Sequence, residues 1–251
     1  MRDENYWVGK WREALERADD FKAGQPFPNI VLDNFLPPVL ANLALHAFPP
    51  IDSDVWRFAG NEHTARKGVV AYGEYQCKEL QFSPEAMAVF YFLMGCPMIK
   101  YLEALTGIAG LVPDPHFVEG GFHVVGTGGR LGIHADFSHH ARTGLERRLN
   151  LLLYLNPDWC PEYGGELGLY DEQLNRVVKV EPVHNRAVIF ATSDSSYHGH
   201  PEPMSAPDTF LRRSIALYYY TLPRAERARR MIQFPGDPEF YHPGKDAKPH
   251  A

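Results

Sequence analysis

Two histidines and one aspartate in this chain have the types and the spacing of a metal site. His134 and Asp136 are separated by one residue, so on an extended strand their side chains point to the same face and can grip one ion. His198, far along the chain, is a candidate third ligand on a neighbouring strand. Two imidazoles and one carboxylate occupy one face of an octahedral metal and leave three positions open, which is the ligand set of non-haem Fe(II) oxygenases.

The residues alone leave two alternatives at this site. His139 and His140 closely follow Asp136, so a histidine-rich surface turn would also explain the tripeptide. The segment SYHGHP contains both His198 and His200, which share a face if the segment is extended, and either imidazole can complete the ligand set.

Residues 148–156, RLNLLLYLN, have the pattern of a strand with two different faces. Alternation places Asn150, Leu152 and Tyr154 on one face. The residues on the other face are Leu149, Leu151, Leu153 and Leu155. Such a strand fits a wall between a ligand cavity and a supporting layer of helices.

The stretch from Gly120 to about Arg230 resembles the 2-oxoglutarate- and Fe(II)-dependent dioxygenases, particularly their prolyl 4-hydroxylase-like branch. Five segments carry the resemblance in the family's order: GGFHVVGTGGRLGIHADF, RRLNLLLYLNPDW, GGELGLYD, VEPVHNRAVIFATSDSSYHGHP and RRSIALYYY. The interval between His198 and Arg212 is longer than is usual in the family, and we interpret residues 202–211 as an inserted loop.

The resemblance implies a role for each candidate residue. The implied iron ligands are His134, Asp136 and His198. Arg212 would bind the C5 carboxylate of the cosubstrate 2-oxoglutarate, assisted by Tyr154 and by Ser214, which shares a strand face with Arg212. The adjacent Arg213 would then face solvent. The candidates for contacting the substrate or for orienting the other groups are Asn150, His123 and His200.

The implied reaction is the hydroxylation of an unactivated C–H bond, with Fe(II), 2-oxoglutarate and O2 as cofactors and ascorbate as a stimulant. Succinate and CO2 would be released. The branch indicates a prolyl residue or proline-like ring as substrate, and free amino acids, glycans and other small metabolites are the alternatives. Asp136 argues against halogenation, because related halogenases replace this carboxylate to admit halide.

Two functions of other classes compete with this interpretation. A non-catalytic cupin-like binding or sensing module would keep the fold, but it has no need for the complete set of His134, Asp136, His198 and Arg212. A Zn(II) hydrolase needs a general base beside the metal and leaves Arg212 without a role.

The elements that must position these residues indicate a mainly β fold with flanking helices. From residue 119 onward, short apolar segments alternate with clusters of Gly, Asn, Asp and Pro, which predicts a double-stranded β-helix, the jelly-roll or cupin-like barrel. We expect one domain over residues 1–251. Its parts would be helical support with early strands over 1–118, the catalytic jelly roll over 119–222, and a C-terminal helix and tail over 223–251.

Helices are expected over residues 4–22 and 83–107, with a short one over 226–232. The apolar stripe of the first would contain Trp7, Trp11, Leu15 and Ala18 at helical spacing. Ser83 is the expected N-cap of the second, Gly107 its stop, and Pro97 its point of division. Ile30 to Leu32 would form a strand, followed by a helix that Pro37 and Pro38 can start.

Composition limits the partners. The formal net charge of −6 and pI near 6.0 offer no broad cationic field for nucleic acid or an anionic membrane. Cys77, Cys96 and Cys160 are odd in number and widely spaced, which argues against a disulfide framework. With a charged N-terminal stretch, this predicts a cytoplasmic protein. The resemblance implies a small-molecule, peptide or protein substrate as its partner, and the oligomeric state stays open.

The mouth of the pocket is expected to be built by residues 56–80 and 199–211. The first of these segments carries Arg57, His63, Arg66 and Lys67, which can meet an acidic substrate or form an ordinary solvated loop.

Overall fold

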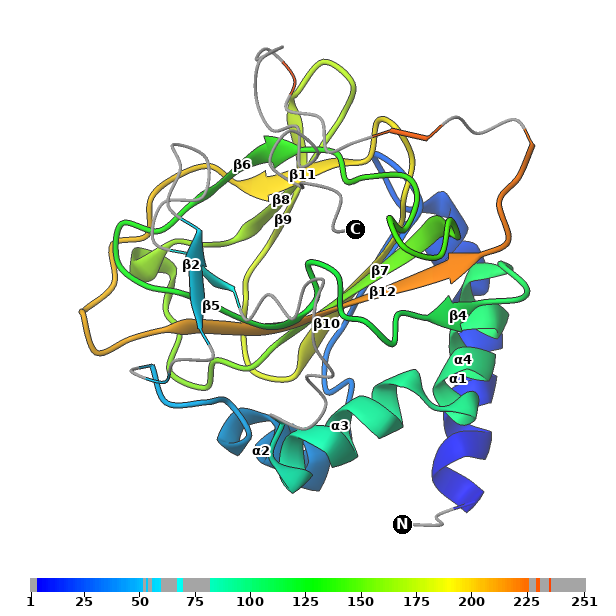
Figure 1. Ribbon diagram of the computed structural model, residues 1–251, viewed down its shortest axis with the longest axis horizontal. Helices are drawn as coiled ribbons and strands as arrows, with labels where there is room; N and C mark the ends of the chain where they lie inside the picture. The colour runs from blue at the N-terminus through cyan, green and yellow to red at the C-terminus, as the bar shows by residue number, and fades with distance from the viewer. Residues whose placement is uncertain are drawn as a thin grey trace, which may run out of the picture.

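The strands of this protein form two facing antiparallel sheets. The computed structural model describes residues 4–51, 53, 56–59, 67–69, 82–225, 229, 230 and 235. Figure 1 shows the sheets one above the other, with the helices on the outer side of the larger sheet. The mainly β fold of the jelly-roll type, with flanking helices, is confirmed.

The larger sheet supports most of the candidate residues. Its strands run in the order β1 (Asn29–Leu32), β10 (Arg186–Ala191), β7 (Glu146–Tyr154), β12 (Arg212–Thr221), β5 (Gly121–Val125), β3 (Lys67–Val69) and β2 (Arg57–Ala59), and β4 (Val112–Pro113) pairs with β12. The smaller sheet runs β6 (Leu131–His134), β11 (Tyr197–His200), β8 (Leu167–Tyr170) and β9 (Arg176–Val180). A short 3-10 turn, Pro161–Tyr163, precedes β8.

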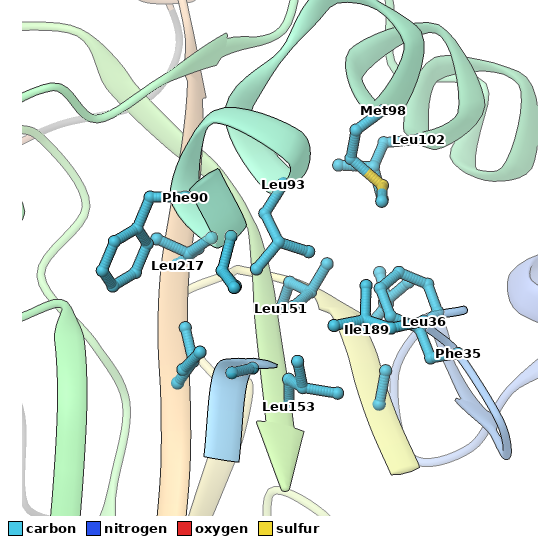
Figure 2. Packing of buried hydrophobic residues seen from close by; sticks show 14 of the residues in the cluster. Phe35, Leu36, Phe90, Leu93, Met98, Leu102, Leu151, Leu153, Ile189 and Leu217 are labelled. Atoms are coloured by element: carbon cyan, nitrogen blue, oxygen red, sulfur yellow. The ribbon is translucent and has the colours of Figure 1, made fainter. Parts of the chain in front are cut away.

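The main core lies between the larger sheet and four helices. These are α1 (Glu4–Ala23), α2 (Pro38–His46), α3 (Pro84–Met94) and α4 (Cys96–Thr106). Leu151 and Leu153 of β7 point toward Leu93 of α3 and Ile189 of β10 (Figure 2). All four leucines of the predicted apolar face of β7 are in this core, so the two-faced interpretation of that strand is confirmed on its helix side.

The local signals at the start and end of α3 and α4 act as expected. Ser83 caps α3, its Oγ accepting a hydrogen bond from the backbone N–H of Ala86 at 3.1 Å. The segment divides at Gly95, with Pro97 in the first turn of α4, where a missing N–H costs no hydrogen bond. Gly107 ends α4 in the left-handed region at φ 71°, where a glycine is favoured.

The predicted helix over residues 4–22 is confirmed, but part of its predicted apolar stripe is wrong. Trp11 and Leu15 are 39% and 69% exposed, whereas Ala14 and Phe21 are buried. Trp7, Ala14 and Phe21 are also at helical spacing, and small Ala14 allows close approach to the neighbouring elements. Two stripes satisfied the same periodicity, and tertiary packing selected the one with the smaller central side chain.

Two other predictions fall largely outside the described residues. In the segment 56–80, expected at the mouth of the pocket, Arg57 lies in β2 and Lys67 in β3, which extend the larger sheet beside β5. His63 and Arg66 lie outside the described residues. Of the helix expected over 226–232, Arg229 and Arg230 are described and are not helical. The backbone of Arg230 instead bonds to Ser138, whose N–H donates to the Arg230 carbonyl at 3.0 Å.

In the described part of the chain, no helix taken singly is long and apolar enough to cross a membrane. The pair α3 and α4, bent by 41°, meets that test only by length and composition.

Candidate metal centre

The three predicted ligands meet between the two sheets. His134 is the last residue of β6, Asp136 follows two residues later, and His198 pairs with His134 across the β6–β11 ladder. One nitrogen or oxygen of each residue lies within 4.8 Å of the others. The Nε2 atom of His134 is 3.6 Å from Oδ1 of Asp136, and Nε2 of His198 is 3.5 Å from Oδ2.

Both imidazoles are held in the tautomer that a metal requires. Nδ1 of His134 contacts the Gly132 carbonyl at 2.9 Å, and Nδ1 of His198 contacts the Ser196 carbonyl at 3.0 Å. Because a carbonyl only accepts, each Nδ1 carries a hydrogen, and in the neutral ring Nε2 then has the lone pair, on the side of Asp136. Burial lowers the pKa of His198 to about 4, which keeps this ring neutral at neutral pH.

The Asp136 carboxylate is held by an arginine and an asparagine. Arg147 Nη2 lies 2.9 Å from Asp136 Oδ2, and Asn150 Nδ2 donates to the same oxygen at 2.7 Å. Burial alone would raise the pKa of the Asp136 carboxyl, but the Arg147 charge and the nearby imidazoles hold it well below its usual value. The carboxylate is therefore ionised and ready to bind a cation.

Arg147 is the site residue that sequence reasoning missed. Strict alternation would place it with Leu149 on the helix side of β7. The pairing of β7 with β12 instead shifts, since Tyr219 faces Leu149 but Tyr220 faces Arg147, and this leaves Arg148 as the extra residue of a β-bulge. The bulge returns Arg147 to the face of Asn150. Adjacent arginines at the start of this strand point to opposite faces, which indicates that one of them enters a buried face but does not say which face.

A second cluster forms around Arg212. This side chain is 4% exposed, its Nε donates to the Gly165 carbonyl at 2.6 Å, and its Nη2 donates to the Tyr154 hydroxyl at 3.3 Å. Ser214 pairs with Tyr154 on one side and with His123 on the other. Burial raises the pKa of Tyr154, so its hydroxyl stays protonated and available as a donor. Arg213 lies on the opposite face of β12, as the strand alternation predicted.

The loop over residues 202–211 folds back against this cluster. Met204 exchanges backbone hydrogen bonds with the turn at Gly128 and Gly129, at 2.8 and 3.0 Å. Gly165, at φ 80°, lies beneath it, and a Cβ built there would be 2.9 Å from Arg212 Cδ and 3.0 Å from Met204 Sδ. The inserted loop therefore packs on the arginine and leaves room only for glycine at position 165.

The predicted site residues all line one cavity between the sheets. They are His123, His134, Asp136, Asn150, Tyr154, His198, His200, Arg212 and Ser214. His123 Nε2 contacts the Glu119 carbonyl at 3.1 Å, and His200 pairs with Leu131 after a shift in the β6–β11 ladder. The cavity thus brings two imidazoles and a carboxylate into the same space as a buried guanidinium, an arrangement that suits a metal together with a carboxylate ligand.

The comparisons with known proteins agree with this arrangement. Residues 120–220 match the family model of the 2OG-Fe(II) oxygenase superfamily. No curated protein matches the chain. A prolyl 4-hydroxylase from Pseudomonas putida superposes with a TM-score of 0.57 at 18% identity, over 83% of this chain and 98% of that one.

Two other solved structures share the fold. A prolyl hydroxylase from Trichoplax adhaerens, in complex with a peptide fragment of the hypoxia-inducible factor oxygen degradation domain, gives a TM-score of 0.55 at 19% identity, over 87% of this chain and 94% of that one. HygX from Streptomyces hygroscopicus, with nickel, 2-oxoglutarate and hygromycin B bound, gives 0.50 at 10% identity, over 82% and 86%. The solved structures show a prolyl 4-hydroxylase-like fold. Residues 120–220, which match the 2OG-Fe(II) oxygenase superfamily model, contain the His–Asp–His cluster, and together these findings support a dioxygenase that uses Fe(II) and 2-oxoglutarate.

Proposed function

We propose that this chain hydroxylates an unactivated C–H bond, with His134, Asp136 and His198 as its Fe(II) ligands. The observation that carries the assignment is the pair of imidazoles whose Nδ1 atoms are tied to backbone carbonyls, which leaves both Nε2 lone pairs beside one ionised carboxylate. This donor set fits Fe(II) and leaves coordination positions for other ligands.

We assign the C5 carboxylate of 2-oxoglutarate to Arg212, assisted by Tyr154 and Ser214. The guanidinium is buried and planar, so it can meet a carboxylate with two parallel N–H donors. The Tyr154 hydroxyl accepts from Arg212 and keeps its own proton to donate. When bound, iron and 2-oxoglutarate supply the oxidation of substrate by O2, with release of succinate and CO2.

The substrate that we propose first is a prolyl residue or a proline-like ring. Its support is the fold shared with a prolyl 4-hydroxylase and with a peptide-bound prolyl hydroxylase. A small metabolite is the second candidate, because HygX, with the same fold, binds hygromycin B. Both candidates require the same metal and cosubstrate cluster.

The test begins with anaerobic titration of the protein with Fe(II) and then with 2-oxoglutarate. The loaded enzyme is next exposed to air with prolyl peptides, proline, a panel of amino acids and aminoglycosides, and succinate and products heavier by one oxygen atom are measured. Asp136→Ala is the control for metal-dependent turnover. Substrate-dependent succinate from prolyl compounds supports the proposal, whereas coupled turnover only with other small molecules overturns the prolyl assignment. Absence of Fe(II) binding overturns the ligand assignment.

A further inference from the structure

We propose that Arg147 and Asn150 are positioning residues that fix Asp136 so that it offers one oxygen to the metal. The inference rests on the proposed function, since it concerns the same site. Both residues reach the same atom, Oδ2: Arg147 Nη2 forms an ion pair with it at 2.9 Å, and Asn150 Nδ2 donates a hydrogen bond to it at 2.7 Å. Both contacts therefore engage Oδ2, whereas Oδ1, 3.6 Å from His134 Nε2, has neither of them, and this leaves Oδ1 as the atom for coordination.

Arg147 is itself buried against two aromatic rings. It is 1% exposed, and its guanidinium carbon lies 3.5 Å from the ring centroid of Tyr218 and 4.6 Å from that of Phe137. Its Nε donates to Asn150 Oδ1 at 2.9 Å, which in turn directs the Asn150 NH2 group toward Asp136. The hydrogen bond from Arg147 to Asn150 therefore sets the direction in which the Asn150 amide points at Asp136.

Stability alone does not account for this arrangement. A buried ion pair loses hydration that its attraction only partly returns, and apolar side chains of similar volume often stabilise a fold as well. The bulge at Arg148 also interrupts a regular ladder in order to turn Arg147 inward. The geometry is explained if the buried charge orients a metal ligand, because groups that hold a ligating carboxylate raise metal affinity.

The consequence concerns the open coordination positions. Two imidazoles and one carboxylate oxygen would leave three positions on a bound metal, and 2-oxoglutarate would need positions among them. A carboxylate free to rotate can bind through both oxygens and take one of those positions. Loss of the Arg147 and Asn150 contacts to Oδ2 is therefore expected to weaken metal binding. It is also expected to make 2-oxoglutarate compete with the second oxygen of Asp136 for the metal.

The experiment compares Arg147→Lys and Asn150→Leu with the matched control Arg148→Lys. Arg148 is the neighbouring bulge residue, and its Nη1 donates to Thr221 Oγ1 at 3.2 Å, away from Asp136. Each full-length protein is titrated anaerobically with Co(II), whose visible spectrum reports its coordination, and then with 2-oxoglutarate. We expect the Co(II) dissociation constant to rise about 10–100-fold in Arg147→Lys and Asn150→Leu, with an altered spectrum, and to change by less than about twofold in the control.

Each outcome decides between distinct conclusions. If the wild-type protein binds no Co(II), the proposed function fails and the inference fails with it. If the wild-type protein binds Co(II) and both folded variants bind it equally well with an unchanged spectrum, only the positioning role is overturned. Circular dichroism of the metal-free variants measures whether they fold. If both variants lose their fold, or if they bind Co(II) more weakly with an unaltered visible spectrum, the two residues have a structural role and the inference is overturned.

Discussion

Replacing Arg212 with alanine is expected to weaken 2-oxoglutarate binding far more than the same change at Arg213. Arg212 lies in the cavity, 4% exposed, whereas the side chain of Arg213 lies on the other face of the strand. The alanine would leave the C5 carboxylate of 2-oxoglutarate in the same buried position without its cationic partner.

The size of the effect follows from burial. Removing one partner of a buried charge pair costs on the order of 2–5 kcal/mol. Tyr154 and Ser214 stay in place as donors, which favours the lower half of that range, about 2–3 kcal/mol. At 1.4 kcal/mol for each factor of ten, the dissociation constant of 2-oxoglutarate rises roughly 30- to 150-fold. Arg212→Lys keeps the charge but loses the planar pair of donors, so it should lie between wild type and alanine.

The assay is anaerobic calorimetric titration of 2-oxoglutarate into the Fe(II)-loaded protein. Thermal unfolding of each variant is measured alongside, because Arg212→Ala also leaves the Gly165 carbonyl without its donor, at a cost of about 1–3 kcal/mol. Arg213→Ala is the matched control, with an expected change of less than about twofold, since its backbone contacts to Asn156 do not involve the side chain. If Arg212→Ala and Arg213→Ala both fold and lose equal affinity for 2-oxoglutarate, the assignment of its C5 carboxylate to Arg212 is refuted.

Three further predictions use the same protein. Fe(II) binding is expected to disappear on alanine substitution at His134, Asp136 or His198 but to persist in His200→Ala, and the reverse result at the two histidines of β11 would show that the ligand is His200. Leu151→Ala should lower the free energy of unfolding by about 2–5 kcal/mol in urea denaturation, because the side chain is fully buried between the larger sheet and the helices, and an unchanged free energy of unfolding would contradict its place in the core. Gly165→Ala should raise the dissociation constant of 2-oxoglutarate and lower the melting temperature, because its Cβ would meet Arg212 Cδ at 2.9 Å in a backbone region at φ 80°, and unaltered binding would contradict this account.

Strand alternation correctly predicted which faces of β7 and β12 most of the candidate residues occupy. Asn150 and Tyr154 share a face of β7, and Arg212 and Ser214 share a face of β12, because these two strands pair in regular register from Ser214–Tyr154 to Tyr219–Leu149. Over that interval each side chain faces the side that a period of two dictates. Residue type and spacing therefore sufficed to bring the anchor residues into one cavity.

Arg147 could not be placed in the same way, because a bulge has no reliable signature in a run such as ERRLN. Its position depends on how β12 pairs with this end of β7, which is a tertiary property. The stripe of α1 failed for a related reason. Trp7 belongs to both helical stripes, and only the neighbouring elements decide whether Ala14 or Leu15 turns inward. Local periodicity predicts that a helix or strand forms, while the elements packed against it decide which of its residues turn toward the interior.

One face of β7 packs in the core that stabilises the fold, and its other face contributes side chains to the candidate metal site. Leu149, Leu151 and Leu153 pack against the helices, and Asn150 lies between them in sequence while its amide holds a predicted metal ligand. Any shift of the strand that loosens the leucine packing must also move that amide, because the backbone is shared. The packed core thus restricts the position of the Asn150 amide that holds Asp136. The bulge places Arg147 on the same face, so Arg147 also contacts Asp136 from a fixed direction. A rigid helix layer on the outer side of the sheet is for this reason part of how the inner face keeps its geometry.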